Sequence, residues 1–183
     1  MVPENWHNDV LSFWFSELTP KQWYISDDDL DKLIEQRFGL ILAELSDQLP
    51  DDIMQNANKC LAAILCFDQF TRNIYRGSGK AFAQDEKALK LSQHIIDQGW
   101  DKTMGPMHQQ FVYMPFMHAE DIEMAKISLE FFSLMGEEAI KAAQDHFNII
   151  EKFGRYPHRN EVVGRFSSPE EIEYLKNAQR FGQ

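Results

Sequence analysis

Cysteine is scarce in this sequence, with two residues, Cys60 and Cys66, placed six positions apart in one apolar segment. On a helix their side chains point in different directions, so we predict buried thiols rather than a redox pair. Glycine and proline are also few, at 9 and 7 of 183 residues. This composition excludes a fibrous protein or a chain of flexible linkers. The sequence therefore predicts a compact fold held by its hydrophobic core.

Long apolar runs are absent as well. The longest, Cys60 to Phe67, has eight residues, whereas a helix needs about 20 to cross a bilayer. The N-terminal segment, residues 1–15, has no basic stretch before its apolar residues and no small-residue cleavage site, so it does not read as a signal peptide. We therefore expect a cytoplasmic protein with one domain that covers residues 1–183.

Positive charge is in short supply, because 18 Lys and Arg residues face 29 Asp and Glu residues and leave a net charge of -11. An acidic protein repels nucleic acids and anionic membranes, so we expect neither as a partner. Five of the seven arginines nevertheless fall in two short segments. They are Arg72 and Arg76 in the first segment, and Arg155, Arg159 and Arg165 in the second. This clustering is the first indication of a functional site.

Sustained alternation of apolar and polar residues is missing, and almost every segment follows a helical period instead. The pattern predicts an all-α fold of about eight helices arranged in antiparallel pairs. Residues 60–67 are apolar on every side, so we expect the third helix to be the most buried. The helices are expected at about residues 4–15, 26–45, 51–75, 82–98, 106–117, 119–134 and 137–153, with a last one that starts at Pro169.

Ionisable side chains interrupt these apolar faces. The stripe of the third helix continues at Asp68 and Arg72, while His118 and His146 fall on the stripes of the sixth and seventh helices. An isolated buried charge is unfavourable, so such groups should be paired. We predict that Asp68 bonds to Arg72, four residues away on the helix, or to an arginine of residues 155–165.

Helix direction then predicts that several of these residues meet. If helices three to seven alternate in direction, the end of the third, the start of the sixth and the end of the seventh lie on one face. The concave site predicted there is lined by Arg72, Arg76, His118, Arg155, His158 and Arg159. His146, lower on its helix, would form the floor, and the further candidates for ligand binding are Asp68, Glu120, Asn160 and Arg165.

Three segments of the chain resemble the signature blocks of an uncharacterised bacterial family, domain of unknown function 924. They are FDQFTRNIYRG at residues 67–77, FVYMPFMHAED at residues 111–121, and the segment 146–165. The resemblance implies an all-helical, tetratricopeptide-like fold, either a right-handed superhelix or a bundle, and it supplies no reaction. Thr71 and Ala119 stand where this family usually has proline and serine, so position 119 offers no hydroxyl nucleophile.

The arginine and histidine cluster has several interpretations. Guanidinium groups bind carboxylates and phosphates through two hydrogen bonds, which predicts a pocket for a small anion or for the carboxylate of a peptide. Alternatively, the arginines fasten the irregular residues 153–165 to helix ends. A tetratricopeptide-like scaffold for protein partners and a hydrolase that uses Asp68 with a histidine are further alternatives. Whether the protein is an enzyme stays open at this point.

A metal or nucleotide cofactor is not expected. His118, His146 and His158 are of a type that binds metals, but the HExxH and HxxEH spacings are absent and the nearby arginines would repel a cation. The segment RGSGK at residues 76–80 is too short for a phosphate-binding loop.

Overall fold

The computed structural model describes residues 2–178, and every regular element in that range is a helix. The α-helices are α1 (Trp6–Ser12), α2 (Asp28–Asp47), α3 (Ala57–Ile64), α4 (Thr71–Ile74), α5 (Asp85–Asp97), α6 (Pro106–His118), α7 (Ile122–Ser133), α8 (Glu137–Phe153) and α9 (Pro169–Leu175). Two π-helices, η1 (Phe13–Glu17) and η4 (Leu65–Phe70), continue α1 and α3. Because α3, η4 and α4 follow one another without a break, they form one long helix, and the predicted all-α fold is confirmed.

Short 3₁₀ turns lie between the longer helices. They are η2 (Pro20–Trp23), η3 (Ile53–Gln55), η5 (Gly79–Phe82), η6 (Trp100–Thr103) and η7 (Pro157–Arg159). The last helix, α9, begins at Pro169 as predicted, because the Ser168 hydroxyl accepts a hydrogen bond from the N–H of Glu171. The Glu171 carboxylate accepts in return from the N–H of Ser168, which completes a capping box.

The predicted start of the third helix near Asp51 is wrong by about one and a half turns. The helix begins at Ala57, and the side chain of Asn56 accepts hydrogen bonds from the N–H groups of Asn58 and Lys59. An asparagine that satisfies these otherwise unpaired donors fixes the point at which a helix can begin.

The predicted start of the sixth helix at residue 119 is also wrong. The side chain of Asp121 accepts from the N–H groups of Glu123 and Met124, so α7 begins at Ile122. His118 is instead the last residue of α6. It still lies at the connection between the two helices, so the face predicted for it is unchanged.

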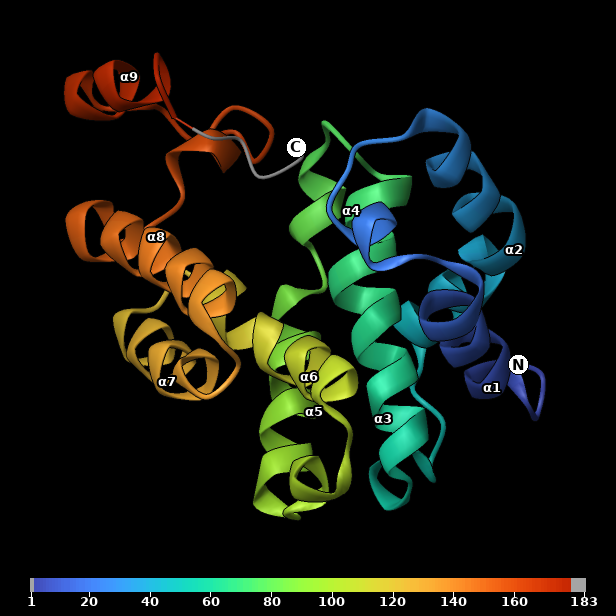
Figure 1. The fold of residues 1–183 in the computed structure, drawn as a ribbon. Helices are drawn as coiled ribbons and strands as arrows, with labels where there is room; N and C mark the ends of the chain where they lie inside the picture. Colours follow the sequence, from blue (N-terminus) through green and yellow to red (C-terminus); the bar gives the residue numbers. More distant parts are fainter. Residues whose placement is uncertain (1, 179–183) are drawn as a thin grey trace.

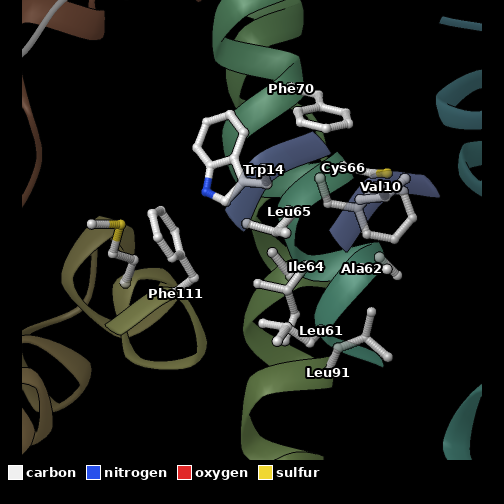
Figure 2. Close-up of a cluster of buried hydrophobic side chains, with 14 of the residues drawn as sticks. Val10, Trp14, Leu61, Ala62, Ile64, Leu65, Cys66, Phe70, Leu91 and Phe111 are labelled. Atoms are coloured by element: carbon white, nitrogen blue, oxygen red, sulfur yellow. The ribbon is translucent and has the colours of Figure 1, made fainter. Parts of the chain in front are cut away.

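The core surrounds α3 and η4, which contact α1, α2, α5 and α6. Residues 60–71 are all buried, which confirms the prediction that this helix is the most buried one. Figure 2 shows Trp14 and Phe70 near one end of the cluster, Phe111 of α6 at its side, and Leu61 and Leu91 near the other end. The ring centroid of Trp14 lies 5.6 Å from that of Phe70 and 5.5 Å from that of Phe111, so Trp14 packs directly on both rings.

A second, smaller apolar cluster joins α7, α8 and the segment that follows them. Its buried residues are Ala125, Ile149, Ile150 and Tyr156. The pair α7 and α8 lies beside α6, and α9 follows at the far end of α8 (Figure 1). The helices therefore form a bundle of pairs, and within residues 2–178 none is long and apolar enough to cross a membrane.

We predict that Leu65→Ala lowers the free energy of unfolding by about 2 to 5 kcal/mol, because the Leu65 side chain is fully buried. Urea denaturation followed by circular dichroism measures this loss. The control is Leu40→Ala, since Leu40 is 85% exposed on α2 and should change stability by less than about 0.5 kcal/mol. A loss below about 1 kcal/mol at Leu65 would show that this helix does not organise the core.

Candidate active-site pocket

A pocket of about 890 Å³ opens between α4, α6, α8 and the segment around η2. This volume lies within the range of about 300 to 1,000 Å³ that is usual for small-molecule sites. The lining includes a group of arginine and histidine side chains, here called the polar wall, together with apolar side chains. The predicted site residues that line the pocket are Arg72, Arg76, His118, His146, His158 and Arg159. The structure thus brings the two arginine-rich segments of the sequence together.

Asp68 lies directly behind this polar wall and is 1% exposed. Its Oδ1 accepts a hydrogen bond from Nδ1 of His118 at 2.7 Å and lies 3.2 Å from Nη1 of Arg72. Its Oδ2 accepts from the amide of Gln69 at 2.6 Å. The prediction that Asp68 pairs with Arg72 is confirmed.

The charge of Asp68 follows from these neighbours. Burial raises the pKa of its carboxyl group, but the guanidinium of Arg72 and the imidazole of His118 outweigh burial and lower that pKa well below its usual range. Asp68 is therefore an ionised acceptor at neutral pH. Because a carboxylate can only accept, Nδ1 of His118 carries the hydrogen, and Nε2 holds the lone pair when the ring is neutral.

Asp68 owes its position to the π-helix η4. At the end of η4 the N–H of Thr71 bonds to the carbonyl of Cys66, five residues back, so the turn is wider than in an α-helix. The hydroxyl of Thr71 donates to the carbonyl of Phe67 at 2.6 Å, an oxygen that would accept from the N–H of residue 71 in an α-helix. Thr71 thus takes part in the widened turn.

Asp85, which sequence reasoning missed, links the two arginine segments. Arg72 donates to both of its carboxylate oxygens, at 2.9 and 3.0 Å, and Arg159 donates to Oδ2 at 3.1 Å. Arg159 also donates to the backbone carbonyl of His118 at 3.1 Å. Asp85 lies in the first turn of α5, where an acidic residue is ordinary, so nothing in the sequence marks it as a partner.

Arg76 has a separate acidic partner in Asp31. Its Nε donates to Oδ2 at 2.7 Å and its Nη2 to Oδ1 at 3.0 Å. Asp31 also accepts from the side-chain amide of Asn73 at 2.7 Å. These bonds hold α4 against the first turn of α2, and they place Arg76 at the pocket wall.

Arg159 is the most deeply buried of the lining arginines, with 7% of the residue exposed. Its guanidinium lies 4.3 Å from the ring centroid of Phe82 and 4.5 Å from that of Tyr156. Burial and the nearby charge of Arg72 lower its pKa from the usual arginine value. Among the described residues, no group accepts a hydrogen bond from its buried Nε. The positive charge of Arg159 is therefore only partly compensated.

His146 and His158 contribute no positive charge at neutral pH. Burial, with repulsion from His118, lowers the pKa of His146 to about 3, and burial with repulsion from Arg159 lowers the pKa of His158 to about 3. His146 donates from Nδ1 to the carbonyl of Ala142 at 2.8 Å, because a carbonyl can only accept. The fixed positive charge of the wall therefore comes from its arginines.

Besides Asp68, four predicted site residues lie outside the pocket lining. The Arg155 guanidinium donates to both carboxylate oxygens of Glu171, at 2.7 and 2.8 Å, rather than facing the pocket. Arg165 donates to Glu120 at 2.8 Å, and Asn160 donates to Ser167 at 3.0 Å. These contacts fasten the irregular segment after α8, which matches the alternative interpretation for this part of the cluster. The prediction that Arg155 shares the concave site is corrected accordingly.

The apolar part of the lining contains side chains that the sequence did not single out. They are Trp23, Tyr24, Phe82, Met107, Met114, Met117, Phe132 and Met135. Methionine side chains adapt their shape to a ligand. At the mouth lie the exposed acidic residues Glu137, Glu138 and Asp145. Serine, threonine, cysteine and lysine are absent from the lining among the residues that the structure describes.

The structure also shows how the side chains that could bind a metal ion are placed. Within residues 2–178, no three or more His, Cys, Asp or Glu side chains are placed so that they could hold a metal ion together.

Residues 10–179 match the family described as a bacterial protein of unknown function, DUF924. The chain belongs to this family. The DUF924 chain is also similar to a solved structure, that of the protein of unknown function ATU0120 from Agrobacterium tumefaciens, with 31% identity and a TM-score of 0.89. The similarity covers 94% of this chain and 97% of that one. A comparison with curated proteins finds no match.

We predict that Asp68→Ala lowers the free energy of unfolding of this DUF924 protein by about 3 to 5 kcal/mol. The substitution leaves the buried charge of Arg72 with one carboxylate instead of two and leaves His118 without its acceptor. Urea denaturation at pH 7 measures the loss. Asp52→Ala is the control, because Asp52 pairs with Lys59 at the exposed surface and should cost far less. Equal losses would show that the Asp68 pairs are no stronger than surface pairs.

The contribution of Asp68 should depend on pH. Its folded-state pKa is lowered, so its stabilisation is complete above the unfolded-state pKa of about 3.9 and disappears as the pH falls through the folded-state value. We expect the difference in Tm between the wild type and Asp68→Asn to be constant from pH 8 to pH 5 and to shrink below about pH 4. A difference that grows on acidification would contradict the assignment of an ionised Asp68.

Proposed function

We propose that this protein binds a small organic molecule with one anionic group, a carboxylate or a phosphate, in the 890 Å³ pocket. The observation that carries the proposal is Arg159, a buried guanidinium in the pocket wall whose Nε has no hydrogen-bond acceptor. A buried donor without a partner is unfavourable, and a charged one more so. An anionic group bound in the pocket beside Arg159 would offset this charge.

The remaining polar wall is arranged to hold such an anion. Asp85 and Asp31 fix the guanidinium groups of Arg72, Arg76 and Arg159, so these groups lose little conformational freedom when a ligand binds. Asp85 is shared by two arginines, and Arg72 has Asp68 as a second carboxylate, whereas Arg159 has only its share of Asp85. Guanidinium groups held in this way favour the planar oxygens of a carboxylate or the oxygens of a phosphate.

The rest of the pocket supports a ligand with an apolar body. The volume exceeds what inorganic phosphate needs, and the methionine and aromatic lining would contact carbon atoms. The acidic residues at the mouth, Glu137, Glu138 and Asp145, would repel a ligand with several negative charges. We therefore propose one anionic group at the arginine wall and an apolar portion against the methionines.

The scaffold alternative differs in the identity of the ligand. A partner protein would place the carboxylate of a peptide at the same arginines, and the apolar lining would hold its side chains. The pocket favours a small molecule because it has the volume of a small-molecule site and combines bonded arginines with apolar side chains. We also propose a cytoplasmic location, which is supported by the free, buried thiols Cys60 and Cys66.

We predict that hexanoate or phenyl phosphate raises the Tm of the wild type more than hexanamide does at equal ionic strength. A ligand at about 100 times its dissociation constant adds about 2.7 kcal/mol to the free energy of unfolding. Arg159→Gln should abolish this difference, because it removes the buried guanidinium. Calorimetric titration measures the same affinity without thermal unfolding.

Arg155→Gln is the matched control, since Arg155 is an arginine of the same segment that lies outside the lining. It should keep the full response to the anions. If Arg159→Gln folds poorly, Arg159→Lys retains the charge but loses the guanidinium edge and should weaken binding. Equal responses of the wild type, Arg155→Gln and both Arg159 variants would refute the proposed site. A response to a peptide with a free C-terminus but to neither small anion would favour the scaffold.

A further inference from the structure

His118 stands between a buried carboxylate and the pocket. Its Nδ1 is 2.7 Å from Oδ1 of Asp68, and the ring lines the cavity. The carboxylate has two further fixed partners, Gln69 and Arg72, so it cannot turn away from the histidine. The imidazole is therefore held in one orientation and one tautomer, with Nε2 on the side opposite to Asp68. A carboxylate that fixes a histidine in this way is the arrangement used to prepare a general base.

We propose that His118 is a general base that activates water for the hydrolysis of a carboxylic ester bound in this pocket, with Asp68 as its positioning residue. The inference rests on the proposed function, because the arginine wall would hold the anionic group of the same ligand. It adds a reaction to that binding site.

The lining favours water as the nucleophile. No serine, threonine, cysteine or lysine belongs to it among the described residues, so no side chain of those types is at hand to form a covalent acyl intermediate. Position 119, next to His118, is alanine. A histidine base without a neighbouring side-chain nucleophile acts directly on water.

The step balances without any oxidant or reductant. Nε2 of His118 takes a proton from water while the water oxygen forms a bond to the ester carbonyl carbon. The carbonyl π electrons move to oxygen and give a tetrahedral oxyanion. When that intermediate collapses, the bond to the alkoxy oxygen breaks, and this oxygen receives the proton from the His118 imidazolium. The products are a carboxylic acid and an alcohol.

Arg159 is placed to stabilise the charge that develops. Its guanidinium donates to the backbone carbonyl of His118, so its positive charge lies beside the histidine. A positive charge held in a buried site makes a large contribution to stabilising a developing oxyanion. An ester suits the site better than a phosphate ester does, because its reacting carbon carries no negative charge that the acidic mouth would repel.

The test uses the mono-4-nitrophenyl ester of glutaric acid, which carries one carboxylate, and neutral 4-nitrophenyl butyrate. We expect the wild type to hydrolyse the anionic ester faster than the neutral one, and more slowly in D₂O than in H₂O. His118→Gln should lower kcat by about 10²- to 10⁴-fold with little change in KM. His94→Gln is the control, because His94 lies on α5 outside the pocket lining and should keep full activity.

Two further measurements separate catalysis from structural support. Added imidazole should restore part of the activity of His118→Ala, which a purely structural role would not allow. Asp68→Asn should lower kcat more than it raises KM, because the histidine would lose its negatively charged acceptor while Asp85 and Asp31 still hold the lining arginines. If Asp68→Asn does not fold, the imidazole rescue decides the matter alone.

Binding is measured separately with the 4-nitroanilide of glutaric acid, an amide that resists hydrolysis. Stabilisation by the amide that Arg159→Gln abolishes, without ester hydrolysis in the wild type, would overturn the general-base inference and leave the proposed function intact. Absence of both stabilisation and hydrolysis would overturn both. Hydrolysis that survives in His118→Gln would exclude His118 as the base.

Discussion

The carboxylate of Asp68 is the contact on which the rest of the pocket depends. It belongs to a closed ring of polar bonds that runs from Asp68 to Arg72, Asp85, Arg159 and His118 and returns to Asp68. The ring joins η4, α4, α5, η7 and α6, which are far apart in the sequence. Because each member is largely buried and bonded on two sides, removing one leaves its two neighbours with one partner fewer in a buried site. The ring thus fixes the arginine wall and the orientation of the histidine together.

The fold could be predicted from the sequence where one physical cause dominated. Residues 60–67 offer no polar side, so burial of this helix followed directly. The pair of Asp68 and Arg72 followed from a spacing of four residues and from the high free energy of an unpaired buried charge. Both inferences needed only local sequence. The helix starts at residues 51 and 119 were misplaced because Asn56 and Asp121 act as caps, a role that many asparagines and aspartates do not have.

The remaining features of the site depended on partners that the sequence does not identify. Asp31 and Asp85 look like ordinary first-turn acidic residues, yet they bind the lining arginines. Arg155 resembles Arg159 in sequence context, but Glu171 on α9 takes up its guanidinium. Acidic side chains that are distant in the sequence therefore determine which arginine faces the pocket. The local sequence around each arginine does not predict this. The methionine lining was hidden for the same reason, because apolar helix faces predict burial without showing where packing leaves a cavity.

Because of the π turn at Leu65–Phe70, the loss of one residue within it would change the direction in which the site residues point. An α-helix advances by about 100° per residue, since 3.6 residues complete one turn. Deletion of one residue within this turn would restore a regular α-helix. The helix segments before and after the deletion would then be rotated relative to each other by about that angle. The core upstream, around Leu61, could keep its packing, while Arg72 and everything after it would face a different direction. A family built on this helix can therefore retain its core and lose its pocket through the loss of one codon.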